Sequence, residues 1–212
     1  MIKKKKSFFV GLCLIVAFIL WTLLVCFVDV QAIGPRESSV GFAKLNGFVH
    51  ELVGTNTYLY TLTDWLGLVP IGVALCFAVL GLIQWIKRKS FVKVDYNIHI
   101  LGWFYIVVMA VYILFETVFI NYRPVLINGY LEKSYPSSTT MLVACVMPTA
   151  MLQFRARIKN KMVRRCVIFA IAAFTAFMVV GRVLSGVHWI TDIIGATFIS
   201  AGLVMMYYSI CD

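Results

Sequence analysis

The chain has 212 residues, of which 62% are hydrophobic and only 13% are charged. That composition excludes an ordinary soluble domain, in which about 45–50% of residues are apolar and about 25% are charged. The formal net charge of +10 comes from basic residues scattered over short segments between apolar stretches. This scatter disfavours a nucleic-acid-binding surface and favours contact with anionic lipid headgroups.

Apolar stretches of about 20 residues, the length that crosses a bilayer as a helix, recur along the chain. They predict an all-α membrane protein with six transmembrane helices, at residues 7–29, 68–86, 98–120, 138–154, 166–183 and 191–210. We expect them to form a single membrane-embedded domain over residues 1–212.

Lysine and arginine residues are divided unevenly between the two sides of the membrane that these spans define. Most lie in residues 3–6, 87–93 and 155–165, and the opposite side holds only Arg36, Lys44, Arg123, Lys133 and Arg182. Because basic segments stay in the cytoplasm, both termini are predicted to be cytoplasmic. The chain is then a multi-pass protein of the cell membrane.

The predicted extracytoplasmic loop at residues 31–67 contains one segment of amphipathic character. In "SVGFAKLNGFVHELV", apolar residues recur close to helical spacing with Lys44, Asn46 and Glu51 between them. The pattern predicts a helix that lies along the outer membrane interface. Such a helix either covers a site or simply rests on the lipid headgroups.

Charged groups inside or at the border of a span are costly and therefore informative, and five ionisable residues in or near the predicted spans stand out: Glu116, Arg123, Arg182, His188 and Asp192. The predicted topology places all of them toward the outer ends of their spans. The hydroxyl residues Ser137, Ser138, Thr139 and Thr140 open the fourth span on the same side. Each group alone has an ordinary explanation as a snorkelling arginine, a helix cap or a polar pair. Their arrival at one membrane depth from four separate elements favours a functional site.

These residue types suit one chemistry. Two arginines offer paired donors to a tetrahedral oxyanion, and the start of a helix with exposed N–H groups binds anions. A histidine with a carboxylate one helical turn away is a nucleophile whose second ring nitrogen is held in place. The set predicts transfer of a phosphoryl group to His188 and then to water.

Three segments resemble the motifs of the type 2 phosphatidic acid phosphatase family, within the vanadium haloperoxidase-like superfamily. The family motifs are Lys-x6-Arg-Pro, Pro-Ser-Gly-His and Ser-Arg-x5-His-x3-Asp. Their counterparts in this chain are "ETVFINYRP", "PSST" and "GRVLSGVHWITD", which begin at Glu116, Pro136 and Gly181. Motif order and both spacings within the third motif are the same.

The resemblance implies a role for each matched residue. Arg123 and Arg182 would grip the phosphate oxygens, and Ser137 and Ser138 would complete the cradle with backbone N–H groups. His188 would form a phosphohistidine and Asp192 would orient it. Neither a metal nor a cofactor is implied, since the arginines supply the positive charge. The site would face the outer leaflet and act on a phospholipid or a polyisoprenyl phosphate or diphosphate.

The chain departs from the family pattern at positions that matter for the chemistry. Glu116 replaces the lysine, and Thr139 replaces the histidine that protonates the leaving group, a task for which a hydroxyl is far too weak an acid. Lys133 is a candidate to supply the positive charge that the family's lysine provides.

Several readings of the function remain open. The protein is an active phosphatase with a good leaving group such as a lipid phosphate, or another acid, for example Glu116, replaces the histidine. Alternatively it binds or transports a phospholipid without turnover. A channel or transporter is a further alternative, which the clustering of charges at one end of the bundle disfavours.

Overall fold

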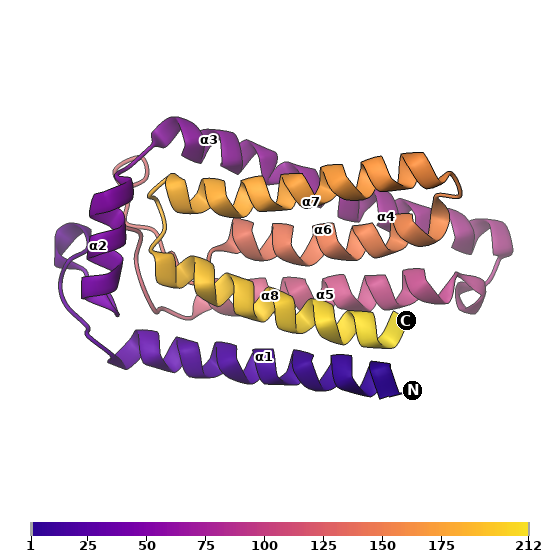
Figure 1. Cartoon of the computed structure of the whole chain (residues 1–212), viewed down its shortest axis with the longest axis horizontal. Coiled ribbons are helices and arrows are strands. Elements are labelled where there is room, and N and C mark those ends of the chain that lie inside the picture. Colours follow the sequence, from indigo (N-terminus) through magenta and orange to yellow (C-terminus); the bar gives the residue numbers. More distant parts are fainter. Residues whose placement is uncertain (1, 212) are drawn as a thin grey trace.

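The computed structural model describes residues 2–211, so Met1 and Asp212, the ends of the predicted domain, lie outside the described residues, as do the side chains of Ile2 and Lys3. The long helices run side by side along one axis (Figure 1). They are α1 (Ile2–Phe27), α4 (Leu68–Arg88), α5 (Tyr96–Thr117), α6 (Ser138–Arg157), α7 (Lys161–Leu184) and α8 (Ile190–Cys211). Two shorter helices, α2 (Ala43–Val53) and α3 (Thr57–Leu66), follow α1, and the short 3-10 turns are η1 (Pro35–Glu37) and η2 (Phe91–Lys93).

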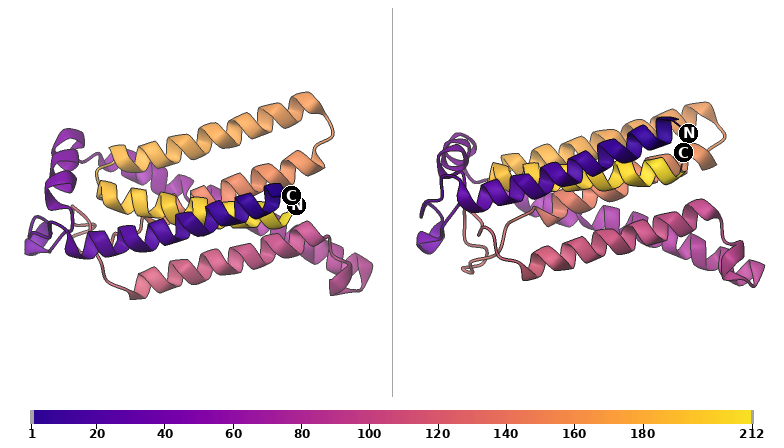
Figure 2. Two further views of the ribbon diagram at one scale, coloured as in Figure 1. Left: turned by 60° about the horizontal axis from the view of Figure 1, so that its bottom comes forward. Right: turned by 90° about the horizontal axis from the view of Figure 1, so that it is seen from below.

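The start of α1 and the end of α8 lie at one end of the bundle, where the basic connections from α4 to α5 and from α6 to α7 also lie (Figures 1 and 2). The motif-bearing connections lie at the other end. This arrangement is the one expected if the predicted orientation holds.

Within residues 2–211, five helical stretches are long and apolar enough to cross a membrane: Lys4–Phe27, Thr57–Arg88, Tyr96–Thr117, Lys161–Leu184 and Ile190–Cys211. Helix α6 is not among them, so the count of six spans stays a prediction. The physical reason lies in its position, because α6 contacts α4, α5, α7 and α8. A helix surrounded by other helices needs small and polar residues for packing more than it needs an apolar surface for lipid.

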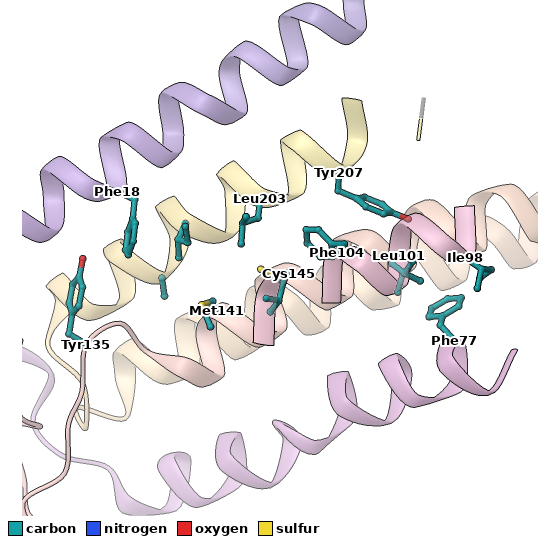
Figure 3. Close-up of a cluster of buried hydrophobic side chains, with 14 of the residues drawn as sticks. Phe18, Phe77, Ile98, Leu101, Phe104, Tyr135, Met141, Cys145, Leu203 and Tyr207 are labelled. Atoms are coloured by element: carbon teal, nitrogen blue, oxygen red, sulfur yellow. The ribbon is translucent and has the colours of Figure 1, made fainter. Parts of the chain in front are cut away.

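The core of the bundle follows the length of α8 and α6. Figure 3 shows Met141 and Cys145 of α6 beside Leu203 of α8 and Phe104 of α5, all of them buried. Helices α1 and α8 approach closely where Gly11 faces Gly202: a Cβ atom at Gly11 would lie 2.9 Å from the Gly202 carbonyl oxygen. Small residues at such contacts let two helix backbones pack together in a membrane.

The predicted amphipathic helix is present as α2, and it crosses the motif-bearing end of the bundle (Figure 1). Its start is held by the loop after α1, because Asp29 Oδ2 accepts a 2.8 Å hydrogen bond from the Lys44 N–H. That bond lowers the pKa of Asp29. Phe48 and Leu52 are exposed on its outer face, while Asn46 on the opposite face is buried. The apolar face therefore points away from the protein, as expected for a helix at a membrane interface.

Asn46 binds α2 to the start of α8. Its Nδ2 donates to the Gly41 carbonyl at 2.7 Å and to Thr191 Oγ1 at 3.0 Å, and its Oδ1 accepts from the Thr191 N–H at 3.3 Å. Thr191 is the neighbour of Asp192, so α2 helps to fix the helix start that carries a predicted site residue.

Helix α3 was not expected as a separate element. Asn56 caps it by accepting a 2.9 Å hydrogen bond from the Leu59 N–H, and it continues through Gly67 into α4. It packs against α7. Three of its side chains consequently reach the site described below.

Candidate active site

The predicted site residues come together at the motif-bearing end of the bundle. Arg123 lies in the connection from α5 to α6, and Ser137, Ser138 and Thr139 lie at the start of α6. Arg182 lies near the end of α7, and His188 and Asp192 lie around the turn from α7 into α8. The turn needs Gly186, which has a φ of +65° and whose Cβ would lie 1.8 Å from the Gly54 carbonyl oxygen.

His188 lies between Arg123 and Asp192. Its Nε2 is 3.1 Å from Arg123 Nη1, and its Nδ1 is 3.5 Å from Asp192 Oδ2. A guanidinium group carries donors only, so Nε2 must offer its lone pair to Arg123. The ring proton is therefore on Nδ1, on the side of Asp192, and the lone pair on Nε2 faces the arginine.

Surrounding charge and burial favour the neutral form of His188. Its side chain is buried, and burial, followed by the positive charges of Arg123 and Arg182, holds the pKa of His188 well below its usual range. A neutral imidazole keeps the lone pair that a nucleophile needs.

Asp192 is fully buried, and its position is fixed by the start of α8. Its Oδ2 accepts a 3.0 Å hydrogen bond from the Trp189 N–H. Asn121 and Ser134, from the connection between α5 and α6, lie beside the same carboxyl group. Asp192 is thereby positioned to orient His188.

The two arginines have different surroundings. Arg123 Nε is 3.1 Å from Glu132 Oε2. Arg182 is 1% exposed, and it donates from Nη2 to Thr139 Oγ1 at 2.7 Å and from Nη1 to Thr63 Oγ1 at 3.3 Å. Arg182 Nη2 is also 3.5 Å from Asp64 Oδ1.

A tyrosine from α3 lies beside both arginines. The ring centre of Tyr60 is 5.8 Å from the Arg123 guanidinium carbon and 5.2 Å from that of Arg182. Both distances are within the range of cation–π attraction. One aromatic ring thus holds two like charges near each other.

The arginines also carry buried donors that suit an oxyanion. Among the described residues, Arg182 Nε is buried without a hydrogen-bond partner, whereas the buried Arg123 Nε faces Glu132 Oε2 at 3.1 Å. Buried donors without acceptors are rare in folded proteins and call for an explanation. A multivalent oxyanion such as phosphate supplies acceptors of the required number and charge.

The start of α6 differs in part from the phosphate cradle predicted from the sequence. The Ser137 N–H donates to the Asp192 carbonyl at 3.2 Å, and the Ser137 hydroxyl donates to Thr140 Oγ1 at 3.0 Å. The Ser137 side chain therefore does not cap the helix. The backbone N–H groups of the first turn, beginning at Ser138, remain available as anion donors.

A cavity of about 340 Å³ opens beside these residues. Arg123, His188 and Ser138 line it together with Glu116 and Lys133. The ammonium group of Lys133 donates to the Glu116 and Thr117 carbonyls at the end of α5, at 2.7 and 3.2 Å. Lys133 thus lies at the cavity, with its charge directed at the α5 terminus.

The segment before α6 is held in place by Tyr135. Its hydroxyl is 2.7 Å from Thr22 Oγ1 of α1, and its ring stacks on Phe18 at 6.3 Å between ring centres (Figure 3). On its other side it touches α8 at Gly195, where no side chain intervenes. The loop that carries Ser137 is therefore anchored to both α1 and α8.

Sequence reasoning missed the α3 contribution, namely Tyr60, Thr63 and Asp64, and the buried amides Asn46 and Asn121. Asp64 carried the available signal, because it is an acidic residue close to the start of an apolar stretch. The described residues contain no group of three or more His, Cys, Asp or Glu side chains that could hold a metal ion.

Comparison with known proteins points to one family. The model of the PAP2 superfamily matches residues 116–211, a segment that contains every predicted site residue but not α3. No curated protein sequence matches the chain. The chain is also similar to the crystal structure of the first transmembrane PAP2 type phosphatidylglycerolphosphate phosphatase from Bacillus subtilis. The TM-score is 0.51 at 17% identity over 94% of this chain and 93% of that one. The shared fold and the apolar helices make this chain an integral membrane protein.

Proposed function

We propose that the protein is a membrane lipid phosphatase of the PAP2 superfamily, whose model matches residues 116–211. It hydrolyses the phosphate or diphosphate monoester of an amphiphilic lipid through a phosphohistidine at His188. The observation that carries the proposal is the alignment of Arg123, His188 and Asp192, with distances of 3.1 and 3.5 Å on the two sides of the imidazole ring.

The reaction follows from this alignment. Substrate phosphate takes over the donors of Arg123, which frees the Nε2 lone pair of His188 to attack phosphorus. Asp192 stabilises the imidazolium that forms, and Arg182 with the first N–H groups of α6 binds the remaining oxygens. Water then displaces His188 and releases phosphate.

The substrate class is inferred from the setting of the site. The solved protein with the same fold is described as a phosphatidylglycerolphosphate phosphatase, which acts on a lipid phosphate. Six spans with both termini in the cytoplasm, as the basic residues favour, direct the site to the outer leaflet.

Phosphate release from lipid monophosphates and diphosphates by the purified protein tests the proposal. We expect release by the unmutated protein and a loss of several orders of magnitude in His188→Ala, since the nucleophile is removed. His99→Ala is the matched control, because His99 lies in the first turn of α5 and packs on Phe91 of η2, away from the motif-bearing connections. Release from no substrate would refute the phosphatase, and equal release by His188→Ala would exclude the phosphohistidine.

A second candidate, binding of a phospholipid without turnover, is favoured by one observation. Arg182 already has three protein partners, Thr63, Asp64 and Thr139. A binding protein would show saturable lipid binding without phosphate release, and His188→Ala would leave that binding unchanged.

A further inference from the structure

A second cavity adjoins the first at the start of α6. It has a volume of about 430 Å³, and Tyr112, Ser138 and Met141 line both cavities. Its other walls are mostly apolar and come from α4, α5 and α6: Leu68, Ile71, Val108, Met109 and Leu142. The first cavity is lined by charged groups and suits a phosphate, whereas the second suits an apolar chain.

One carboxyl group lines the apolar cavity, that of Asp64. Its side chain is 56% exposed and forms part of the wall of that cavity. Arg182 Nη2 is 3.5 Å from Asp64 Oδ1 and 2.7 Å from Thr139 Oγ1, so both oxygens lie near the same nitrogen atom. The Asp64 carboxyl group therefore lies next to Thr139 and to a residue that would hold phosphate.

We propose that Asp64 is the general acid that protonates the leaving oxygen of a lipid monophosphate. The inference rests on the proposed function, because it concerns the same phosphoryl transfer. With Asp64 as the acid, phosphate esters of ordinary lipid alcohols become substrates, although Thr139 has no acidic proton to give.

Geometry selects Asp64 over the other carboxyl groups of the site. In phosphoryl transfer the attacking and leaving groups lie roughly in line, so the acid must stand on the side of phosphorus away from the nucleophile. Glu116 and Glu132 line the same cavity as His188. Asp64 lines the neighbouring cavity, of which His188 is not a wall.

The two steps balance as follows. The His188 Nε2 lone pair forms a bond to phosphorus while the P–O bond to the lipid breaks, and the leaving oxygen takes the proton of Asp64. In the second step water attacks phosphorus, the N–P bond breaks and returns its electron pair to His188, and Asp64 removes a proton from the water. The net products are lipid alcohol and inorganic phosphate, and Asp64 is protonated again.

Leaving-group dependence tests the assignment, with Asp64→Asn compared on phosphatidate and on a polyisoprenyl diphosphate. An alcohol leaves poorly without a proton, whereas a phosphate group, with a second pKa of about 6, leaves well as an anion. We expect Asp64→Asn to lower kcat/KM for phosphatidate by about 10²- to 10⁴-fold and that for the diphosphate by less than about tenfold. The asparagine keeps an oxygen that accepts from Arg182, so the arginine stays in place.

Two further variants make the result decisive. Glu116→Gln tests the competing carboxyl group and is expected to leave the ratio of the two kcat/KM values unchanged. Glu51→Gln removes an acid at an exposed position of α2 and controls for loss of surface charge. Thermal unfolding in detergent identifies a variant that has lost its fold. If Asp64→Asn is unfolded, Asp64→Glu, which retains a carboxyl group, is tested in its place. Greater phosphatidate hydrolysis by Asp64→Glu than by Asp64→Asn supports the role of Asp64 as the acid.

Several outcomes would overturn the assignment. These are equal losses on both substrates in Asp64→Asn, no loss on either, or a leaving-group-selective loss in Glu116→Gln instead. Hydrolysis of the diphosphate alone by the unmutated protein would also overturn it while leaving the phosphatase intact. Hydrolysis of neither substrate would count against the proposed function itself.

Discussion

Replacement of Gly195 by alanine is expected to disturb the active site through Tyr135. A Cβ atom at Gly195 would lie 2.6 Å from the Tyr135 hydroxyl oxygen and 2.8 Å from two of its ring carbons. The tyrosine has little freedom to retreat, because it is 3% exposed, stacks on Phe18 and bonds to Thr22. The clash must therefore shift the ring and the segment attached to it.

The magnitude follows from three contributions to the free energy of unfolding. Overpacking a well-packed contact costs about 1–3 kcal/mol. Loss of the hydrogen bond between Tyr135 and Thr22 costs about 1 kcal/mol. Replacing glycine by alanine within a helix returns about 0.5–1 kcal/mol. The net expectation for Gly195→Ala is a destabilisation of about 1–3 kcal/mol.

Activity is expected to fall more steeply than stability. Tyr135 precedes Pro136 and Ser137, so its displacement moves the start of α6 relative to His188. A shift of about 1 Å in a catalytic group reduces a rate by about 10²-fold. We expect a decrease in kcat/KM of that order at a temperature at which the variant remains folded.

Gly72→Ala supplies the matched control. Gly72 is also inside a long helix, α4, but a Cβ atom there would meet no atom within 4 Å. Gly72→Ala therefore has the same gain in helix propensity as Gly195→Ala but not its steric clash. Thermal unfolding in detergent and phosphate release measure both variants. Equal unfolding midpoints and equal rates for Gly195→Ala and Gly72→Ala would refute the reasoning.

Two further predictions concern the elements around the site. Asn46→Ala leaves the buried N–H of Thr191 without its acceptor and should destabilise the protein by about 1–3 kcal/mol. Its unfolding midpoint should lie below that of Glu51→Ala, which alters an exposed residue of the same helix; equal midpoints would contradict the role of Asn46. The lowered pKa of His188 means that its ring releases the proton at a lower pH than a free histidine. Nitrogen-15 NMR, assigned with His188→Gln, should show a neutral imidazole at pH 6, and a midpoint near the usual pKa of about 6.5 would disprove it.

The local features of this protein are readable from the sequence. Runs of apolar residues predict the long helices because each helix satisfies its own backbone within the run, and five of them have the length and hydropathy of a membrane span. The spacing of His188 and Asp192 likewise places them together, since both lie within one turn of the start of α8. Helix α6 shows the limit of this reasoning, because its hydropathy reflects helix neighbours that no local pattern reveals.

Contacts between distant segments required the tertiary structure. The motif spacings do not show that Arg182 binds Thr63 and Asp64, which precede it by more than one hundred residues. Nor do they show that Asn46 reaches the start of α8 or that Tyr135 packs against Gly195. Each of these contacts depends on how the helices pack, which side-chain volume and shape determine across the whole bundle. The sequence alone supplied a histidine, a carboxyl group and two arginines in a pattern typical of phosphate chemistry, and the packing of α3 against α7 decided that Asp64 lies beside Arg182.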